Sequence, residues 1–170
     1  MTPHRLVLIR HAKAADGALD IVRPLAPRGR DDAGAIGRFL ERAGVAPDLV
    51  VVSPALRARQ TWAGAQAELA AVIELAVDDR IYDNDVTSLL ATISGTPQNI
   101  QVLAMVGHNP SFAQLAAALD DGEGDDDART RMRSDYPTGC IAIFDLAGPW
   151  AQVRPGSATL QTFAVPRGRS

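Results

Sequence analysis

The sequence predicts an α/β sandwich with a mostly parallel sheet and an antiparallel hairpin at its edge. Two observations lead to this prediction. Strand-like and helix-like segments alternate three times along the 170 residues, and two strand-like segments then follow each other at the end. The early strands are apolar throughout, as in Leu6-Val7-Leu8-Ile9 and Leu49-Val50-Val51-Val52. Such strands are typical of a parallel sheet that is covered on both faces.

The boundaries of the elements follow from residues that begin or end helices. Asp31 and Asp32 suit the positive end of a helix dipole, and Gly44 suits the C-cap of the same helix. Ser53 is expected to cap the next helix, with Pro54 at its first position. In chain order, the expected strands cover residues 6–9, 48–52, 72–77, 100–106, 140–146 and 157–165, and the expected helices cover residues 31–43, 55–71, 86–93 and 111–119.

Residues 120–135 form the least regular stretch. The first half is acidic, the second half is basic, and few of its side chains are apolar. Charge runs of this kind usually stay solvated. The pattern predicts a mobile surface loop, which could still form one wall over a site.

Composition limits the classes of function. The chain has 17 Lys and Arg against 20 Asp and Glu, a net charge of -3, which argues against nucleic-acid binding through a basic surface. Its length suits a single domain, residues 1–170. No apolar stretch approaches 18 residues without a charge, so we expect no membrane span and a cytoplasmic location. The one cysteine, Cys140, excludes an internal disulfide and a cysteine-based zinc site.

Polar side chains follow three of the expected strands. Because the carboxyl ends of parallel strands meet at one edge of a sheet, these side chains are expected to converge. Arginine presents fixed donors that match phosphate, and histidine is easily held neutral near pH 7 as a nucleophile or base. The pattern predicts phosphoryl chemistry, although one strand end alone could simply precede surface residues. The set comprises Arg10 and His11 after the first strand, Ser53, Arg57 and Arg59 after the second, and His108 and Asn109 after the strand at 100–106.

This set resembles the motifs of the histidine phosphatase superfamily. Arg10-His11-Ala12 is similar to its Arg-His-Gly or Arg-His-Ala signature. Further motifs of the superfamily, and two features of its small SixA-like branch, follow in the same order over nearly the whole chain. They are residues 53–61, Gly107-His108-Asn109-Pro110, Arg23-Pro24-Leu25 with Arg28-Gly29, and Tyr136-Pro137-Thr138-Gly139-Cys140.

The resemblance implies a phosphoglycerate mutase-like fold, which is a three-layer α/β/α sandwich, and it assigns roles to residues. His11 would be the nucleophile that takes the phosphoryl group, and Arg10, Arg57 and His108 would complete the phosphate-binding pocket. Neighbouring arginines disfavour the imidazolium, so they would lower the pKa of the nucleophile. Covalent capture splits one displacement into two easier ones. The sequence offers no carboxylate cluster for magnesium, so we expect no metal and no cofactor.

The general acid is the open position in this scheme. Larger branches of the superfamily carry a Glu or Asp after the middle strand to protonate the leaving group. Asp83 is the candidate here and Asp85 is the second, while the alternative is that both are loop carboxylates. A phosphohistidine substrate needs less help, because a ring protonated on its distal nitrogen leaves as neutral imidazole. An alcohol leaving group has no such route.

The expected function is therefore a metal-independent phosphatase that acts on phosphohistidine in a protein. A phosphatase for small phosphate monoesters and a non-catalytic phosphate-binding module are the alternatives. Other cations have open roles: Lys13 either widens the pocket or stays in solvent, and Arg23 and Arg28 either close the rim or do not. Arg59, two residues after Arg57 on a helix, is expected to face the surface.

Overall fold

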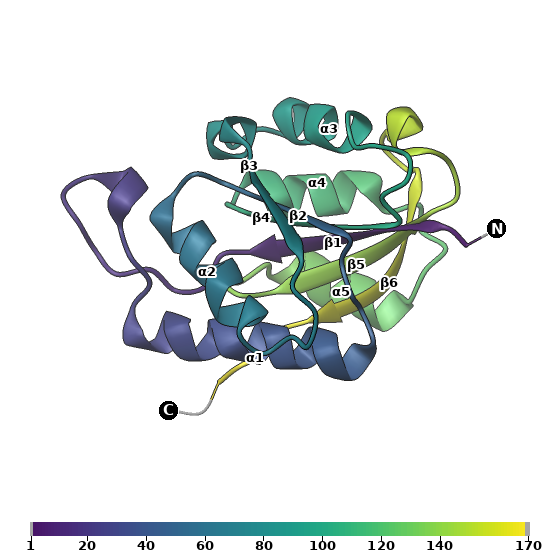
Figure 1. The fold of residues 1–170 in the computed structure, drawn as a ribbon. Coiled ribbons are helices and arrows are strands. Elements are labelled where there is room, and N and C mark those ends of the chain that lie inside the picture. The colour runs from purple at the N-terminus through teal and green to yellow at the C-terminus, as the bar shows by residue number, and fades with distance from the viewer. Residues whose placement is uncertain (1, 169–170) are drawn as a thin grey trace.

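The computed structural model describes residues 2–168 and contains a six-stranded sheet (Figure 1). The strands lie in the order β3-β2-β4-β1-β5-β6. Parallel pairing joins β1 to β4, β4 to β2 and β2 to β3, whereas β5 runs antiparallel to both β1 and β6. The predicted mostly parallel sheet with an antiparallel edge hairpin is confirmed. The strand bounds are β1 His4–Arg10, β2 Leu49–Val52, β3 Glu74–Val77, β4 Val102–Gly107, β5 Ile141–Leu146 and β6 Ala158–Ala164.

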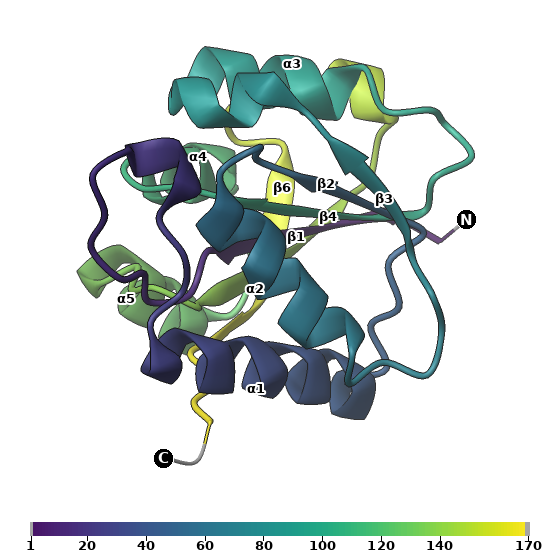
Figure 2. The ribbon, with the colours of Figure 1, turned by 60° about the vertical axis from the view of Figure 1, so that its left-hand side comes forward.

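Helices cover both faces of this sheet and complete three layers. One face carries α1 (Pro27–Ala43) and α2 (Leu56–Gln66). The other face carries α3 (Val86–Ser94), α4 (Ser111–Leu119) and α5 (Asp126–Ser134). Figures 1 and 2 show α3 and α4 above the sheet and α1 below it. The α/β/α sandwich that the sequence predicts is therefore present.

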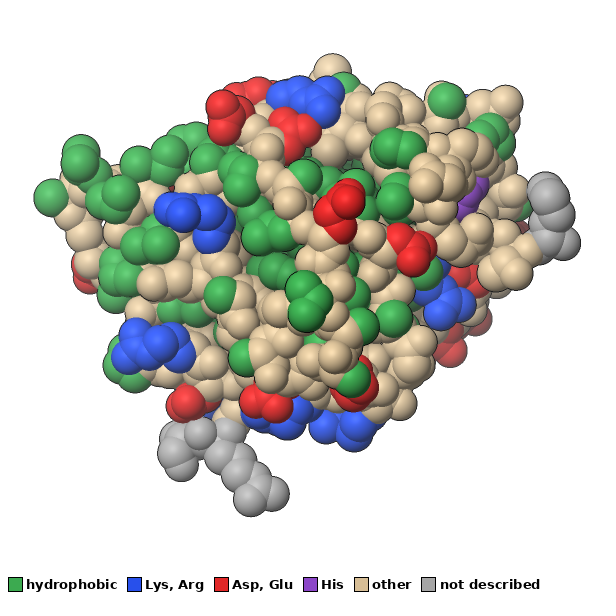
Figure 3. Space-filling model, in the orientation of Figure 1, with side chains coloured by type: hydrophobic (Ala, Val, Ile, Leu, Met, Phe, Trp, Pro, Cys, Tyr) green, Lys and Arg blue, Asp and Glu red, His purple; other side chains and the backbone are tan. Residues whose placement is uncertain are grey.

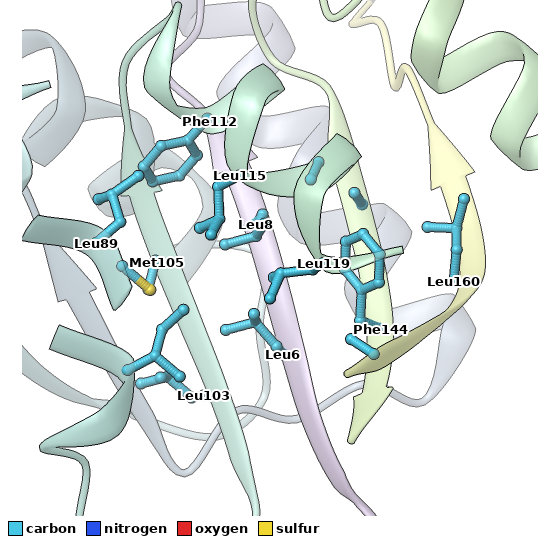
Figure 4. Packing of buried hydrophobic residues seen from close by; sticks show 14 of the residues in the cluster. Leu6, Leu8, Leu89, Leu103, Met105, Phe112, Leu115, Leu119, Phe144 and Leu160 are labelled. Carbon is cyan, nitrogen blue, oxygen red and sulfur yellow. The ribbon is translucent and has the colours of Figure 1, made fainter. Parts of the chain in front are cut away.

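Strand β1 shows why its sequence is apolar throughout. Its side chains alternate between the two layers, so Leu6 and Leu8 pack under the helices of one face while Val7 and Ile9 pack under those of the other. All four are fully buried. Figure 4 shows Leu6 and Leu8 beneath the α4 residues, which include Leu115 and Leu119. Burial on both faces fixes β1 in the centre of the molecule and places its carboxyl end at one edge of the sheet.

The prediction of a mobile loop at residues 120–135 is wrong, because α5 lies within that stretch. The Asp125 carboxylate accepts the N–H of Ala128 and caps the helix. Ala128 and Met132, four residues apart, are buried on the face that packs against β6. One pair of these charges is taken out of solvent, since Arg129 bridges the buried Asp120 carboxylate at 2.7 Å, while Asp126 and Asp127 stay exposed.

Two helix starts also differ from the prediction. Helix α1 begins at Pro27, so Asp31 and Asp32 lie past its first turn rather than in it. Its end at Gly44 is as expected, with φ of 68°, a left-handed conformation that glycine adopts without strain. Helix α2 begins at Leu56, and Ser53 does not cap it.

Among residues 2–168, no helix has both the length and the apolar character that a bilayer crossing requires.

Candidate active site

The carboxyl ends of β1, β2 and β4 meet at a cavity of about 590 Å³. Arg10 is the last residue of β1 and His11 follows it, Arg57 lies at the start of the helix after β2, and His108 follows β4. The structure therefore brings together the four residues that the sequence places in the phosphate pocket. The other residues that line the cavity are Lys13, Ala14, Asp20, Arg23, Tyr82, Asn84, Asn109 and Thr138.

His11 is held in a single orientation with one ring nitrogen free. Its Nδ1 lies 2.7 Å from the carbonyl oxygen of Ala12. A carbonyl can only accept, so Nδ1 carries the proton and Nε2 keeps its lone pair. The backbone is pinned as well, because the N–H of Ala12 donates to Thr61 Oγ1 at 3.0 Å and the Thr61 hydroxyl donates to the Arg57 carbonyl. Nε2 is therefore the atom that can attack phosphorus.

Burial and nearby cations keep this ring neutral. Only 9% of His11 is exposed. Desolvation, followed by the positive charges of Arg57, Arg10 and Arg23, lowers the pKa of His11 to about 4. A neutral imidazole at pH 7 is the form that a nucleophile requires.

His108 faces His11, with the ring centroids 5.2 Å apart. Its Nε2 lies 2.8 Å from Ser53 Oγ, and its Nδ1 lies 3.5 Å from Arg57 Nη2. Burial, followed by repulsion from His11 when that ring is protonated and by the positive charge of Arg57, lowers the pKa of His108 to about 3, so this ring is neutral too. The Arg57 guanidinium can only donate, so Nδ1 of His108 accepts from it and Nε2 carries the proton toward the Ser53 hydroxyl, which can accept or donate. Ser53 thus contacts His108 in the site and does not serve as the helix cap that the sequence predicted.

The two arginines are anchored by different parts of the chain. Arg10 Nη1 donates to the carbonyl of Tyr136 at 3.0 Å, while its buried Nε–H has no hydrogen-bond partner within the described part of the protein. A buried donor without a partner costs free energy, and an anion in the cavity could supply that partner. Arg57 Nη1 donates to the backbone carbonyl of Asp20 at 2.8 Å, and Nη2 donates to its carboxylate at 3.1 Å.

The cavity rim is built from the loop between β1 and α1. This rim loop, residues 14–25, is closed by a β-bridge between Ala14 and Leu25. It carries Asp20, whose carboxylate also accepts hydrogen bonds from Tyr82 Oη at 2.6 Å and from Arg23 Nη1 at 3.1 Å. The Tyr82 hydroxyl, together with Arg57 and Arg23, holds the pKa of Asp20 well below its usual range. Sequence reasoning missed Asp20 and Tyr82, because the contact between them and the contact of Asp20 with Arg57 join residues that are distant along the chain.

Asp83, the expected general acid, does not line the cavity. The short 3-10 helix Asp79–Asp83 presents Tyr82 to the site and leaves Asp83 exposed, with its carboxylate 3.3 Å from Ser88 Oγ. Asp85 caps α3 by accepting the N–H of Ser88. The structure thus corrects the placement of both carboxylates.

The remaining cations divide between the site and the surface. Lys13 and Arg23 line the cavity. Arg28 does not line it, and its Nε instead lies 3.2 Å from the buried carboxylate of Asp32. Arg59 is exposed on α2, as predicted, and donates to the carbonyl of Pro54.

The charge of the cavity is opposite to that of the whole chain. Arg10, Lys13, Arg23 and Arg57 face a single carboxylate there, whereas the net charge of the chain is -3. Guanidinium groups match phosphoryl oxygens, so this local charge favours a phosphoryl dianion. Within residues 2–168, no group of three or more His, Cys, Asp or Glu side chains is arranged to hold a metal ion.

A neutral histidine with a free nitrogen, surrounded by guanidinium groups at the edge of a parallel sheet, is typical of enzymes that transfer phosphoryl groups through a phosphohistidine. Comparison with known families agrees with this chemistry. The model of the histidine phosphatase superfamily, branch 1, matches residues 6–133. The chain belongs to this superfamily, and it is a phosphatase of the SixA-like group.

Individual relatives support the same assignment. The chain is 40% identical to the uncharacterized protein Rv1276c of Mycobacterium tuberculosis (strain ATCC 25618 / H37Rv), over 94% of this chain and 100% of that protein. Among solved structures, a candidate SixA phosphohistidine phosphatase from Nakamurella multipartitia is 29% identical, with a TM-score of 0.86 and 98% of each chain covered. The protein histidine phosphatase SixA complexed with tungstate is 27% identical, with a TM-score of 0.78 over 95% of this chain and 97% of that one.

Proposed function

We propose that this protein is a phosphohistidine phosphatase in which Nε2 of His11 takes the phosphoryl group before water releases it. The observation that carries the proposal is the orientation of His11. The Ala12 carbonyl holds the Nδ1 proton, so the free Nε2 remains available within a cationic cavity.

The first step forms a bond between phosphorus and Nε2 while the bond from phosphorus to the leaving group breaks, with its electron pair going to the leaving group. Arg10 and Arg57 hold the phosphoryl oxygens with paired N–H donors and stabilise their charge as it spreads. When the phosphoryl group takes up the Arg57 donors, the His108 proton can move to Nδ1, with Nε2 accepting from the Ser53 hydroxyl, and Nδ1 then donates to a further phosphoryl oxygen. The proposed role of all three residues is to bind the group as it moves.

The second step releases phosphate. Water attacks phosphorus, the P–Nε2 bond breaks, and its electron pair returns to the ring. His11 leaves as neutral imidazole because its Nδ1 has kept its proton on the Ala12 carbonyl throughout. The proton lost by water goes to the phosphate product. The ring is thereby restored to its starting tautomer.

A phosphohistidine substrate suits this cavity because, among residues 2–168, no protonated carboxylic acid lines it to protonate a poor leaving group. Asp20 is the carboxylate at the site, and its three donors keep it ionised. Asp83 lies outside the cavity. A phosphohistidine ring that carries a proton on its distal nitrogen departs without further protonation, whereas an alkyl ester does not. The names of the SixA relatives point to the same substrate class.

The surface beside the cavity favours a phosphorylated protein over a small molecule. The rim loop exposes Leu19, Ile21 and Val22, at 67%, 41% and 54% of their surfaces. Figure 3 shows hydrophobic side chains projecting at the left-hand end of the molecule, where Figure 1 places this loop. These side chains flank Asp20, so a protein whose phosphohistidine enters the cavity would cover them.

The experiment is capture of the phosphoenzyme from a ³²P-labelled phosphohistidine protein, quenched in alkali. We expect the wild type to become labelled. We expect His11→Asn to take up no label and to show no turnover. His4→Asn is the matched control, because His4 lies at the opposite end of β1. Turnover by His11→Asn would overturn the mechanism. Turnover of small esters but not of the protein would favour the monoester alternative, and phosphate-competitive binding without turnover would favour a binding module.

A further inference from the structure

Asp20 holds a position that the two proposed steps do not explain. Within the described part of the protein, it is the one carboxylate among the residues that line a cavity for anions. A negative charge there opposes binding of a phosphoryl dianion. Its presence therefore calls for a function that outweighs this repulsion.

The Asp20 carboxylate has room for one more donor. It accepts from Arg57, Arg23 and Tyr82, which makes three hydrogen bonds. An ionised carboxylate offers about four acceptor positions. Its side chain is also 51% exposed, so a bound molecule can reach it. Asp20 is thus a fixed anion with access from solvent and remaining acceptor capacity.

Its surroundings link this carboxylate to the reacting centre. Asp20 bonds to Arg57, and Arg57 Nη2 lies 3.5 Å from His108 Nδ1. Tyr82, which donates to Asp20, stands edge-on to His108 with ring centroids 5.7 Å apart. A leaving group that departs from phosphorus toward the rim therefore meets a carboxylate beside an aromatic ring.

We propose that Asp20 is a specificity-determining residue that accepts a hydrogen bond from the distal N–H of a protonated phosphohistidine ring, a role that rests on the proposed function. The substrate ring carries one positive charge before transfer. When Nε2 of His11 bonds to phosphorus, the substrate P–N bond breaks and its electron pair neutralises that charge. The departing imidazole retains its distal proton, so no proton has to be supplied.

The two rings that exchange the phosphoryl group are then held in the same way. The Ala12 carbonyl holds the distal proton of His11, and Asp20 holds the distal proton of the substrate histidine. Each ring leaves phosphorus as a neutral imidazole. A carbonyl suffices for the enzyme's own ring because its geometry is fixed, whereas a charged acceptor attracts a protonated ring from solution.

The rival explanation is that Asp20 only positions Arg57. The two explanations differ in their substrate dependence, because loss of Arg57 positioning would slow every phosphoryl donor equally. Phosphoimidazole has a cationic leaving ring with an N–H. The leaving group of 4-nitrophenyl phosphate departs as an anion and has no N–H. The ratio of kcat/KM for these two substrates therefore isolates the proposed contact.

The experiment measures this ratio for the wild type, Asp20→Asn, Asp20→Glu and Asp83→Asn. Asp83→Asn is the matched control, because it removes the same charge from an exposed carboxylate outside the cavity. We expect Asp20→Asn to lower the ratio by about tenfold to a hundredfold, the usual range for a hydrogen bond to a charged group. Asp20→Glu should recover part of the loss, and Asp83→Asn should keep the wild-type ratio.

The pH profile of kcat for phosphoimidazole supplies a second readout. Asp20 stabilises the protonated substrate ring in the bound state. In Asp20→Asn, the pH at which kcat falls on the alkaline side should therefore be lower by about one unit. Parallel losses on both substrates, with an unmoved limb, would overturn the role of Asp20. A wild type that forms no phosphoenzyme from phosphoimidazole would instead overturn the proposed function.

Discussion

The floor and the rim of the cavity differ in the secondary structure that supplies their residues and in how exposed those residues are. The floor consists of Arg10, His11, Arg57 and His108, which lie at or after the carboxyl ends of buried strands. The rim consists of the rim loop and Tyr82, which belong to irregular segments. On the floor, His11 and Arg57 are 9% and 7% exposed, whereas more than half of Leu19 and Val22 on the rim is exposed. The floor is therefore suited to fixed chemistry, and the rim to substrate choice.

We expect the largest loss of activity on substitution of Arg57, which joins the floor to the rim through its bonds to Asp20. Arg57→Ala removes the guanidinium group that is proposed to hold the phosphoryl group, and it also releases Asp20, to which that guanidinium donates. We expect kcat/KM to fall by about 10² to 10³, the usual cost of losing one transition-state donor. Arg59→Ala is the control, since Arg59 is on the same helix but exposed. Equal activity of the two variants in a steady-state assay would contradict the placement of Arg57.

The second effect is a loss of stability in acid that originates on the floor. His11 and His108 are neutral in the folded protein, with pKa values lowered to about 4 and about 3, while an unfolded chain takes up these protons near pH 6.5. Unfolding therefore binds protons below pH 6.5, so the free energy of unfolding falls as pH drops from about 6.5 toward 4. At about 1.4 kcal/mol for each unit of pKa shift, the full loss is about 3 kcal/mol for His11 and about 5 kcal/mol for His108, the last part of it below pH 4.

Urea unfolding between pH 4 and 8 measures this dependence. In His11→Asn the slope below pH 6.5 should be smaller than in the wild type, because one of the two rings is gone. An unchanged slope would show that His11 does not lie in the buried, cationic surroundings described here.

A smaller effect is the difference in unfolding free energy between losing a buried hydrogen bond and losing an exposed one. Thr61→Val leaves the N–H of Ala12 without its acceptor under the floor and should cost about 1–3 kcal/mol of unfolding free energy. Tyr82→Phe removes a hydrogen bond on the rim and should cost about 1 kcal/mol or less. Denaturant titration of both variants checks the order. If Tyr82→Phe proved the more destabilising, the division into rigid floor and adaptable rim would fail.

The smallest effect concerns the apolar surface of the rim. Leu19→Ser and Val22→Ser should raise KM for a phosphohistidine protein by about threefold to tenfold, since each removes part of the apolar area that a protein would cover. KM for phosphoimidazole should stay at the wild-type value, because this small substrate does not reach those side chains. An equal rise for both substrates would place these side chains in the small-molecule site instead.

The same division explains what the sequence could predict. The apolar runs of β1, β2 and β4 were recognisable, and the polar residues at their ends followed from the rule that parallel strands end at one edge. Asp20 gave no local signal for a place in the site, because its contact with the floor is made through Arg57, which lies 37 residues away along the chain. Asp83 and Tyr82 are neighbours, yet the turn of a short helix decides which of them faces the cavity.

Helix α5 shows a further limit of sequence reasoning. Its nine residues carry only two side chains that bury fully, Ala128 and Met132, among charges that usually indicate solvent. The charges are satisfied by a carboxylate from outside the helix, Asp120, and by the edge strand β6, where Arg131 donates to the Phe163 carbonyl. Neither contact can be read from the spacing of residues within the segment.

The central claim is that Nε2 of His11 accepts the phosphoryl group. NMR of the alkali-quenched phosphoenzyme, labelled with ¹⁵N in histidine, tests it most directly through the coupling between phosphorus and nitrogen. The structure predicts phosphorus on Nε2 of His11, with Nδ1 unmodified. Phosphorus on Nδ1, on His108 or on any other side chain would contradict the account.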